Sequence, residues 1–447
     1  MTNKLIVLVL VILSMGIVFF LADSGVINNK MSPTLIIGFM ILSSYNIGFI
    51  GEKFGLPRIT GYIFSGLLFG PYLITIYKID TVESLSFLNS LALAFIAFNA
   101  GAELRIKDLA KEIKTIVSLT VGVTIFVFSG VTLTVFLLAD LIPFMKGSNI
   151  AVRLGVSSIF GVISVARSPS SAIAIINETR SKGNYTNTIL SVAVIMDVLI
   201  IILFAVIISV CEVLIKGKGA LDINFILFLI FEIFMAFVLG YFLGRFISFL
   251  LTKLKVEFSV IIIALGFFVI KFSHFTGDHF NEIFESSINI EPLLICMAAG
   301  FTVQNFSGHG EIFLKRMDKI SIPVYITFFT ITGASINIDM LKAGWFFGIV
   351  IFISRIAMIY TGSYFSGKIA GSDKKILNNS WLGFITQAGV SLGLLTEVLR
   401  RFPEMGIYIQ TILIASITLN QIIGPVGFKY GLTAVRETLE MRKNKLD

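Results

Sequence analysis

Long apolar runs fill this sequence almost from end to end. About fourteen of them are long enough to cross a bilayer as a helix, which takes about 20 mostly apolar residues, and only short polar breaks separate them. With 56% hydrophobic and 14% charged residues, the chain of 447 residues has more apolar side chains than one soluble core can bury. Lipid is therefore its expected solvent and a bilayer its expected partner.

The apolar runs predict an all-α, polytopic membrane protein. Runs such as residues 6 to 20 are apolar on all sides, whereas the strands of a β-barrel would alternate between apolar and polar residues. The expected spans are 4-21, 34-51, 57-77, 84-101, 115-139, 151-177, 187-211, 223-250, 257-273, 288-304, 320-337, 344-367, 379-398 and 406-428.

Positive charge is unevenly distributed between the two sets of loops. With these spans, 22 Lys and Arg residues fall in alternate loops together with both chain ends, and nine fall in the opposite loops. Cytoplasmic loops of membrane proteins carry the excess of Lys and Arg. We therefore expect a multi-pass protein of the inner (plasma) membrane with both termini in the cytoplasm. The net charge of +8 then indicates topology, and no nucleic-acid partner is expected.

Other sequence signals are weak or missing. Lys4 precedes an apolar stretch that ends near Ala22, as in a signal peptide, but no A-x-A site follows it, so we keep 4-21 as a helix. Cys211 and Cys296 form no motif, and the three His residues lack metal-ligand spacing, so we expect no disulfide, no metal site and no cofactor. The sequence contains no P-loop, so any transport is expected to run on ion gradients.

Two expected spans contain a polar interruption. Residues 167–171 (RSPSS) lie in the sixth span, where Pro169 removes a backbone donor and leaves a carbonyl free. Residues 386–389 (TQAG), with Gln387, form a polar and flexible stretch in the thirteenth. Secondary transporters often break helices at corresponding places in two halves. Inverted repeats with two crossed discontinuous helices are therefore expected, and ordinary kinks are the simpler alternative.

Four charged residues lie deep in expected spans, where an unpaired charge costs at least about 2.5 to 3.5 kcal/mol: Arg167, Asp197, Glu232 and Arg355. Burial and a nearby arginine would act in opposite directions on the proton affinity of Asp197, which makes it a candidate proton carrier. The alternative for Asp197 is an ion pair that only joins two helices, and for Glu232 a position near an interface. Arg167 would pair with Glu232 or contact the broken helix.

Several stretches then occur in an order typical of one family. They are 56–62 (LPRITGY), 65–71 (SGLLFGP), 98–104 (FNAGAEL), Ser168-Pro169, Asp197 and 328–333 (FFTITG). Through these, residues 30 to 430 resemble bacterial monovalent cation:proton antiporters, the Na+ or K+/H+ exchangers in the second branch of the cation/proton antiporter superfamily.

The resemblance implies that Asp197 binds a cation and a proton in competition. It also implies a homodimer, in which each protomer has an interface domain and a core domain that moves past it like an elevator. The cation would be held by the Asp197 carboxylate, by freed carbonyls near Ser168, by the hydroxyls of Ser170 or Ser171, and by water.

Two positions depart from the family pattern. Members often have Asp, Asn or Gln immediately before the ion-binding aspartate, where this chain has Met196, so one oxygen ligand is missing. Many sodium exchangers have a lysine on the later helix, where this chain has Arg355. An arginine can balance the charge of Asp197 but cannot release a proton. With Asp197 as the one titrating carrier, we expect an electroneutral exchange of one proton for one cation.

We expect a single transmembrane exchanger domain over 1-447, with core helices including about 84-177 and 320-398, interface helices between them, and no soluble regulatory domain. Because of Met196, a proton-coupled organic solute or anion transporter of similar fold, or a channel-like protein, is the alternative function. A membrane enzyme or sensor would need a nucleophile with its base or a metal site, and the sequence shows neither.

Overall fold

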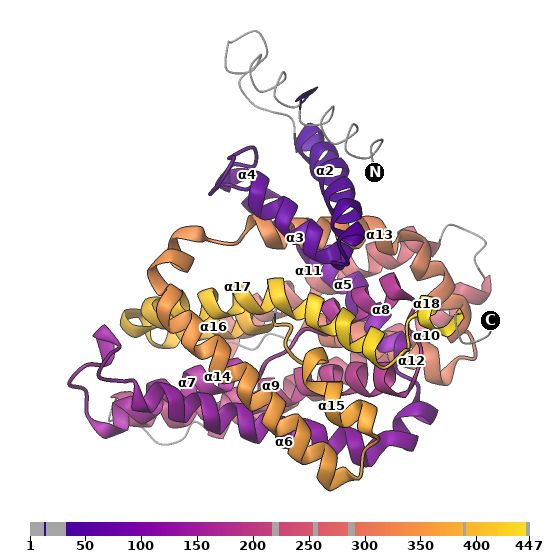
Figure 1. Ribbon diagram of the computed structural model, residues 1–447. Coiled ribbons are helices and arrows are strands. Elements are labelled where there is room, and N and C mark those ends of the chain that lie inside the picture. The colour runs from indigo at the N-terminus through magenta and orange to yellow at the C-terminus, as the bar shows by residue number, and fades with distance from the viewer. Residues whose placement is uncertain are drawn as a thin grey trace.

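The computed structural model describes residues 13–14, 33–216, 223–253, 258–284, 291–387 and 390–443, and every regular element among them is a helix (Figure 1). The all-α expectation is therefore confirmed for the described part of the chain. The expected first span, 4-21, lies outside the described residues apart from 13–14. Seven helical stretches in the described residues are long and apolar enough to cross a membrane: Leu35–Lys53, Leu109–Leu137, Ile150–Thr179, Asn184–Glu212, Ile230–Lys253, Ile338–Ala370 and Pro403–Arg442.

The first half of the chain contains α2 (Pro33–Lys53), α3 (Arg58–Phe69), α4 (Ile79–Ser84), α5 (Ser86–Glu103), α6 (Ile106–Leu137), the short 3-10 helix η1 (Pro143–Met145), α7 (Ile150–Val165), α8 (Pro169–Thr179) and α9 (Asn184–Lys216). The second half contains α10 (Ile223–Lys253), α11 (Phe258–Phe284), α12 (Pro292–Phe306), α13 (Gly310–Ala334), α14 (Ile338–Ala370), α15 (Lys374–Gly383), α16 (Val390–Arg401), α17 (Pro403–Ala434) and α18 (Leu439–Lys443).

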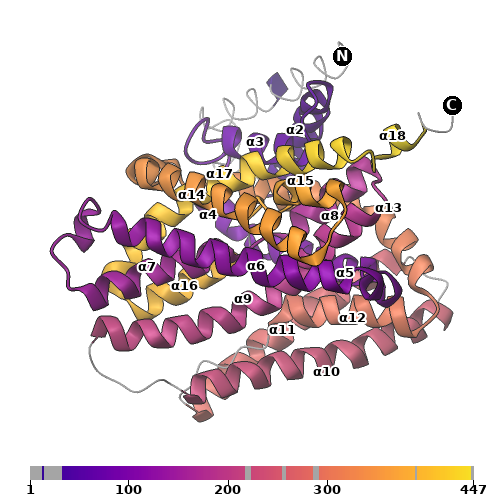
Figure 2. The ribbon, with the colours of Figure 1, turned by 60° about the horizontal axis from the view of Figure 1, so that its bottom comes forward.

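The long helices pack in two groups. Group one contains α6, α7, α8, α9, α14, α15, α16 and α17, and group two contains α2, α3, α5, α10, α11, α12 and α13. The main contacts between the groups are those of α9 with α10, α8 with α5, and α3 with α8 and α17. In Figure 2, α10, α11 and α12 lie together along the lower edge of the molecule, next to α9. The expected core ranges 84-177 and 320-398 each contain helices of both groups, because α5 and α13 pack in group two, while α9 and α17, outside those ranges, pack in group one. Which helices form the core stays a prediction.

Glycines allow the closest helix approaches in group two. A Cβ atom at Gly333 of α13 would overlap the Ile63 carbonyl of α3, and one at Gly66 of α3 would overlap the Thr330 carbonyl of α13. Small residues are what let backbones touch inside a membrane, where apolar burial gives helices little reason to associate. Backbone contact therefore fixes how α3 sits on α13.

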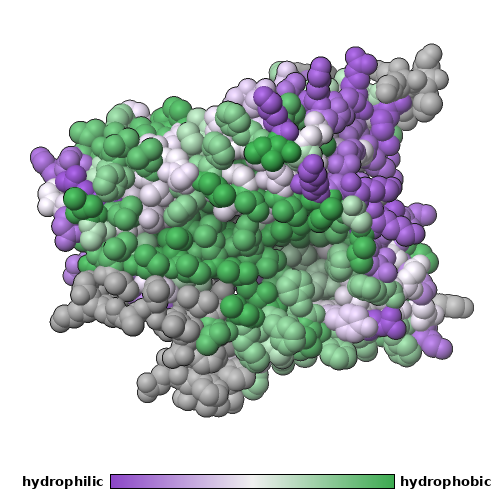
Figure 3. All heavy atoms as spheres, turned by 90° about the horizontal axis from the view of Figure 1, so that it is seen from below, coloured by the Kyte–Doolittle hydropathy of each residue, from purple (hydrophilic) through white to green (hydrophobic). Residues whose placement is uncertain are grey.

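The surface has the polarity of a membrane-spanning protein. Figure 3 shows a broad hydrophobic band across the face seen there, with hydrophilic residues gathered at two opposite edges and more of them at the right-hand edge. Large apolar side chains such as Leu133, Phe242 and Ile353 are more than half exposed along these helices. Lipid would cover such a band, in agreement with the expected solvent.

Gly333→Ala should lower the thermal stability of the protein in detergent. The added methyl group meets the α3 backbone, which cannot turn aside as a side chain can, so a cost of about 1–3 kcal/mol is expected. Gly38→Ala on α2 is the matched control, since a Cβ there meets nothing within 4 Å. Equal melting temperatures for the two variants in a size-exclusion thermal assay would rule out this backbone contact.

Candidate functional site

The first expected interruption is present between α7 and α8. Helix α7 ends at Val165, Ala166 and Ser168 have extended backbone, and α8 begins at Pro169. A proline suits the first position of a helix because its missing N–H would have no partner there. The polar stretch in the sixth expected span is therefore a break in the helix, and α7 and α8 are two separate halves.

Three serines gather where α8 begins. The Ser168 hydroxyl caps the helix by accepting from the Ser171 backbone N at 3.3 Å. It also lies 3.3 Å from Ser170 Oγ and 3.1 Å from Ser171 Oγ. Ser168 and Ser171 are buried and Ser170 is half-buried. Ser168 thus lies within hydrogen-bonding distance of both other serines that the sequence analysis named, at the N-terminus of a helix.

The second interruption lies between α15 and α16. Helix α15 ends at Gly383 and the non-helical stretch begins at Phe384, two residues before the expected one. Gln387 is buried there, and its Nε2 donates to the Ile163 carbonyl of α7 at 2.8 Å. The expected Ala388 and Gly389 lie outside the described residues.

A backbone hydrogen bond joins the two interruptions directly. The Ser168 N donates to the Thr386 carbonyl at 3.2 Å. The two interruptions, which are far apart in the sequence, therefore lie side by side. Both segments are enclosed by protein, which is the condition under which non-helical backbone is tolerated at membrane depth.

Arg355 of α14 ties both interruptions together. It is fully buried, and its guanidinium donates to Ser164 O and Ala166 O of the first segment at 2.7 and 3.1 Å. It also donates to Ile385 O and Phe384 O of the second at 2.7 and 3.4 Å. These carbonyls end α7 and α15, where helix dipoles place partial negative charge. The carbonyls freed near Ser168 are therefore already engaged by an arginine.

Asn420 of α17 completes this network. Its Oδ1 accepts from Arg355 Nη1 at 2.9 Å, and its Nδ2 donates to Gln387 Oε1 at 3.1 Å. The sequence marked Gln387 as part of a break, but its role as a link from α17 to α7 needs the fold. Three polar side chains, Arg355, Asn420 and Gln387, thus form one buried hydrogen-bonded unit with the backbone at the ends of α7 and α15.

The structure shows the partners of Arg167, which the sequence left open. Its Nη1 donates to the Phe384 carbonyl at 2.6 Å, its guanidinium lies 4.5 Å from the centre of the Phe384 ring, and its Nε donates to Met196 Sδ at 2.9 Å. Arg167 therefore contacts the second broken helix rather than Glu232. Met196 serves as a soft acceptor for this arginine.

Asp197 lies half-buried on α9, next to Met196. Among the described residues it forms no hydrogen bond or ion pair with Arg167 or Arg355. Its Oδ1 is enclosed and accepts no hydrogen bond from any described residue. The hydrogen bonds of Arg167 and Arg355 go to carbonyls, to Asn420 and to Met196 instead. Arg355 as a charge partner of Asp197 stays a prediction, because no direct bond joins the two side chains.

The electrostatic neighbour of Asp197 is an acid at the start of α12. Glu291 interacts with Asp197 through space and caps α12, with its Oε1 accepting from Leu293 N at 3.4 Å. Helix α12 has 15 residues, so it spans about 22 Å and is shorter than the ~30 Å hydrocarbon layer. The shortness of this apolar run is the signal that could have marked Glu291.

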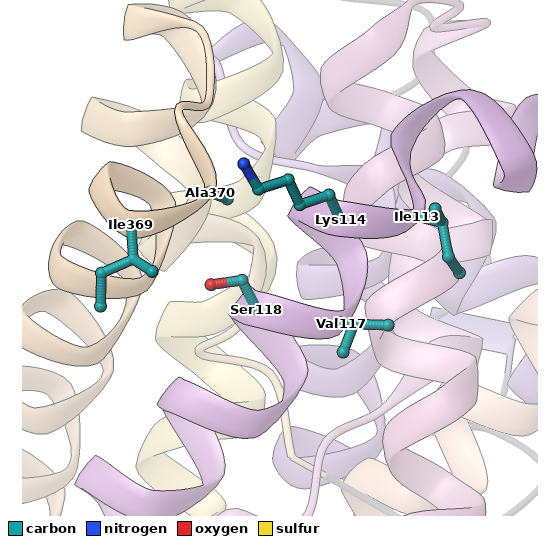
Figure 4. Close-up of a pocket in the computed structure, with 6 residues that line it drawn as sticks. All are labelled: Ile113, Lys114, Val117, Ser118, Ile369 and Ala370. Atoms are coloured by element: carbon teal, nitrogen blue, oxygen red, sulfur yellow. The ribbon is translucent and has the colours of Figure 1, made fainter.

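Two other features lie apart from these residues. Glu232 is half-buried on α10 in group two, so it does not join the buried unit around Arg355. Figure 4 shows a hollow between α6 and α14, with Lys114 and Ser118 directed towards α14. The hollow is lined by Ile113, Lys114, Val117, Ser118, Ile369 and Ala370, none of which belongs to the candidate site.

Interrupted membrane helices held by buried arginines, beside a carboxyl at membrane depth, define an integral membrane transport protein. The profile of the family described as sodium/hydrogen exchanger, transmembrane, matches residues 37–429. The chain belongs to this family, which is a family of transporters. The resemblance drawn from the sequence motifs is thereby confirmed.

Several relatives and solved structures are similar over most of the chain. The probable Na(+)/H(+) antiporter 3 of Methanocaldococcus jannaschii is 24% identical over 391 residues, which are 85% of this chain and 91% of that protein. The Na(+)/H(+)-K(+) antiporter GerN of Bacillus cereus is 22% identical over 417 residues, which are 91% of this chain and 98% of that protein. Two structures of the sodium proton antiporter MjNhaP1 from M. jannaschii are 18% identical, with TM-scores of 0.62 and 0.70 and at least 90% of each chain covered. This chain therefore shares the fold of the two MjNhaP1 structures.

Arg355→Lys should destabilise the protein although the charge is kept. A compact ammonium cannot reach the carbonyls of two segments and Asn420 at once, and each buried acceptor left unpaired costs about 1–3 kcal/mol. Arg245→Lys on α10 is the matched control, since exposed Arg245 donates to the Phe306 carbonyl at 2.9 Å, a bond that lysine can replace. Thermal unfolding in detergent compares the two, and an equal fall in melting temperature would contradict the role of Arg355.

Proposed function

We propose that this chain exchanges a monovalent cation, Na+ or K+, for protons across the membrane, with Asp197 binding the two in turn. The observation that carries the proposal is the enclosed Asp197 Oδ1, which accepts no hydrogen bond from any described residue and lies in the middle of a helix long and apolar enough to cross a membrane. A carboxylate at that depth is costly unless a proton or a cation neutralises it. Membership of the sodium/hydrogen exchanger family and the names of the relatives support this choice of ions.

The cation site would combine Asp197 with the serine cluster at the start of α8. The N-terminus of α8 carries partial positive charge, so the hydroxyls of Ser168, Ser170 and Ser171 would hold a cation only together with the carboxylate and water. The carbonyls near Ser168 would contribute less than the sequence suggested, because Arg355 already engages them. Such a site would hold a monovalent cation loosely and let a proton displace it.

The arrangement of group one supports inverted repeats with a crossed, discontinuous pair. Helices α6, α7/α8 and α9 form a long, a broken and a long element, and α14, α15/α16 and α17 repeat this order. The start of α6 meets the end of α14, where Ser118 Oγ donates to Ser366 O at 2.8 Å, so the leading helices run in opposite directions. The bond between the two interruptions supports the crossing.

Alternating access would come from motion of group one past group two. Group one carries Asp197, the serine cluster and Arg355, and its contacts with group two are few compared with those inside each group. Group two would form the interface domain of a homodimer, as the family resemblance implies. Together with the undescribed first span, the chain would have about fourteen spans, with both termini in the cytoplasm.

Asp197→Asn should abolish exchange. The amide can neither release a proton nor neutralise a cation, while its size keeps α9 in place. In everted vesicles or proteoliposomes, a pH-gradient dye should report proton movement on addition of Na+, K+ or Li+ for the parent protein and none for the variant. Glu232→Gln on α10 is the control and should retain exchange. If no cation moves protons in the parent protein, cation exchange fails, and an organic solute or anion carrier takes its place.

Exchange should be electroneutral, with one proton for one cation. The arginines of the site donate to carbonyls and keep their protons, so Asp197 is the carrier that changes its load. Proteoliposomes on a solid-supported membrane should therefore show no sizeable current when a pH step drives exchange, while the dye assay on the same vesicles shows proton movement. A sustained current would mean that a second carboxyl, with Glu291 as the nearest candidate, also carries a proton.

A further inference from the structure

The last turn of α8 connects group one to group two through polar contacts. Glu178 Oε2 accepts from the backbone N of Arg58, the first residue of α3, at 2.8 Å. Asn177, its neighbour, donates to Tyr325 Oη of α13 at 2.9 Å. Two successive residues at the end of the broken helix therefore each hold a different helix of group two.

Lys429 of α17 strengthens the same corner. Its Nζ donates to the Leu56 carbonyl, just before α3, at 3.0 Å and lies 3.4 Å from Glu178 Oε1. The Glu178 side chain is only 9% exposed, so these contacts are poorly screened by water. We call the contacts of Asn177, Glu178 and Lys429 with group two the α8 bridge.

The α8 bridge lies at the end of the molecule where α9 begins, and the first half of α9 is largely buried there. Residues 188–194 of α9, which precede Asp197, are all buried. After Asp197, residues 198, 199 and 201–203 are half-buried and Val206 is 38% exposed. Approach to Asp197 is thus covered on the side where α8 ends and α9 begins, and it is less covered on the other side.

We propose that Glu178 is a positioning residue that holds group one against group two at this end, so that Asp197 is closed towards it. The inference rests on the proposed function, because a motion of group one past group two has to break the α8 bridge. On the proposed orientation, this end faces the cytoplasm. The bridge would therefore hold the state in which Asp197 is open to the opposite side, and releasing it would open the cytoplasmic route.

A cysteine on α8 can report whether the bridge is closed. Ala174 is 2% exposed and lies one turn before Asn177 and Glu178, on the same face of the helix. In full-length protein with Cys211→Ala and Cys296→Ala, Ala174→Cys is labelled with a membrane-impermeant maleimide added at the cytoplasmic face of everted vesicles. The labelling rate follows the fraction of time for which the α8 bridge is open.

Glu178→Ala should raise this labelling rate about ten-fold, because it removes hydrogen bonds that involve charged partners. Glu178→Gln keeps an acceptor for the Arg58 N and should give a smaller rise; it also carries the test if the alanine variant does not fold. Glu52→Gln is the matched control. Glu52 bonds to the Arg58 side chain at 2.9 and 3.1 Å within group two, so its loss should leave the labelling rate unchanged.

Parent-like labelling of both Glu178 variants, or an equal rise with Glu52→Gln, would overturn the role of Glu178. Labelling does not require transport, so the two proposals can fail separately. Faster labelling in a protein that exchanges no cation would leave the α8 bridge standing and remove the proposed function. Cation exchange with unchanged labelling would leave the proposed function standing and remove the role of the α8 bridge.

Discussion

Carbonyl groups left without partners at two helix breaks are the constraint that organises this molecule. A break inside a membrane exposes C-terminal carbonyls of α7 and α15 to a medium that cannot donate hydrogen bonds. Arg355 donates to both sets, and Arg167 adds a second donor to Phe384 O. Because one buried guanidinium serves two segments far apart in sequence, the breaks are held as a unit. The serine cluster and Gln387 owe their positions to that unit.

The sequence indicated where the breaks and buried charges lie, but not what those charges contact. Pro169 and the polar residues around it mark the first break, and a charge amid apolar residues marks Arg355 and Asp197. Four of the five acceptors of Arg355 are backbone carbonyls, which have no residue-type signature, so the sequence alone suggests a charge-to-charge pairing with Asp197. Phe384 opens the second break, and an apolar residue gives no sign of a helix end. Chain topology and packing supply what residue types cannot.

The division into two groups was also beyond the sequence, for a related reason. Helices α5 and α13 are apolar runs like those of group one, and nothing in their composition assigns them to group two. What assigns them is close backbone contact through single glycines, such as Gly333 against α3 and Gly101 against the α12 backbone. Glycine is common in membrane helices, so the sequence alone does not show which glycine lets two helices pack closely; the helix in contact with it does. Polar contacts between the groups, such as those of Glu178, then become visible as exceptions.

Asp197 forms no hydrogen bond with either arginine among the described residues, and this would give the proposed exchange a physical basis for coupling. If Arg355 bonded to Asp197, the pair would be neutral and could cross the membrane empty, which would let the carrier run without exchange. Instead the arginines face the negative ends of α7 and α15, and the acid in electrostatic reach of Asp197 is Glu291. In the proposed exchange, an unloaded Asp197 would carry an unbalanced charge at membrane depth, at a cost of several kcal/mol. In the proposed exchange, loading by a cation or a proton would remove that cost, so the proposed motion of group one would be favoured only for the loaded carrier.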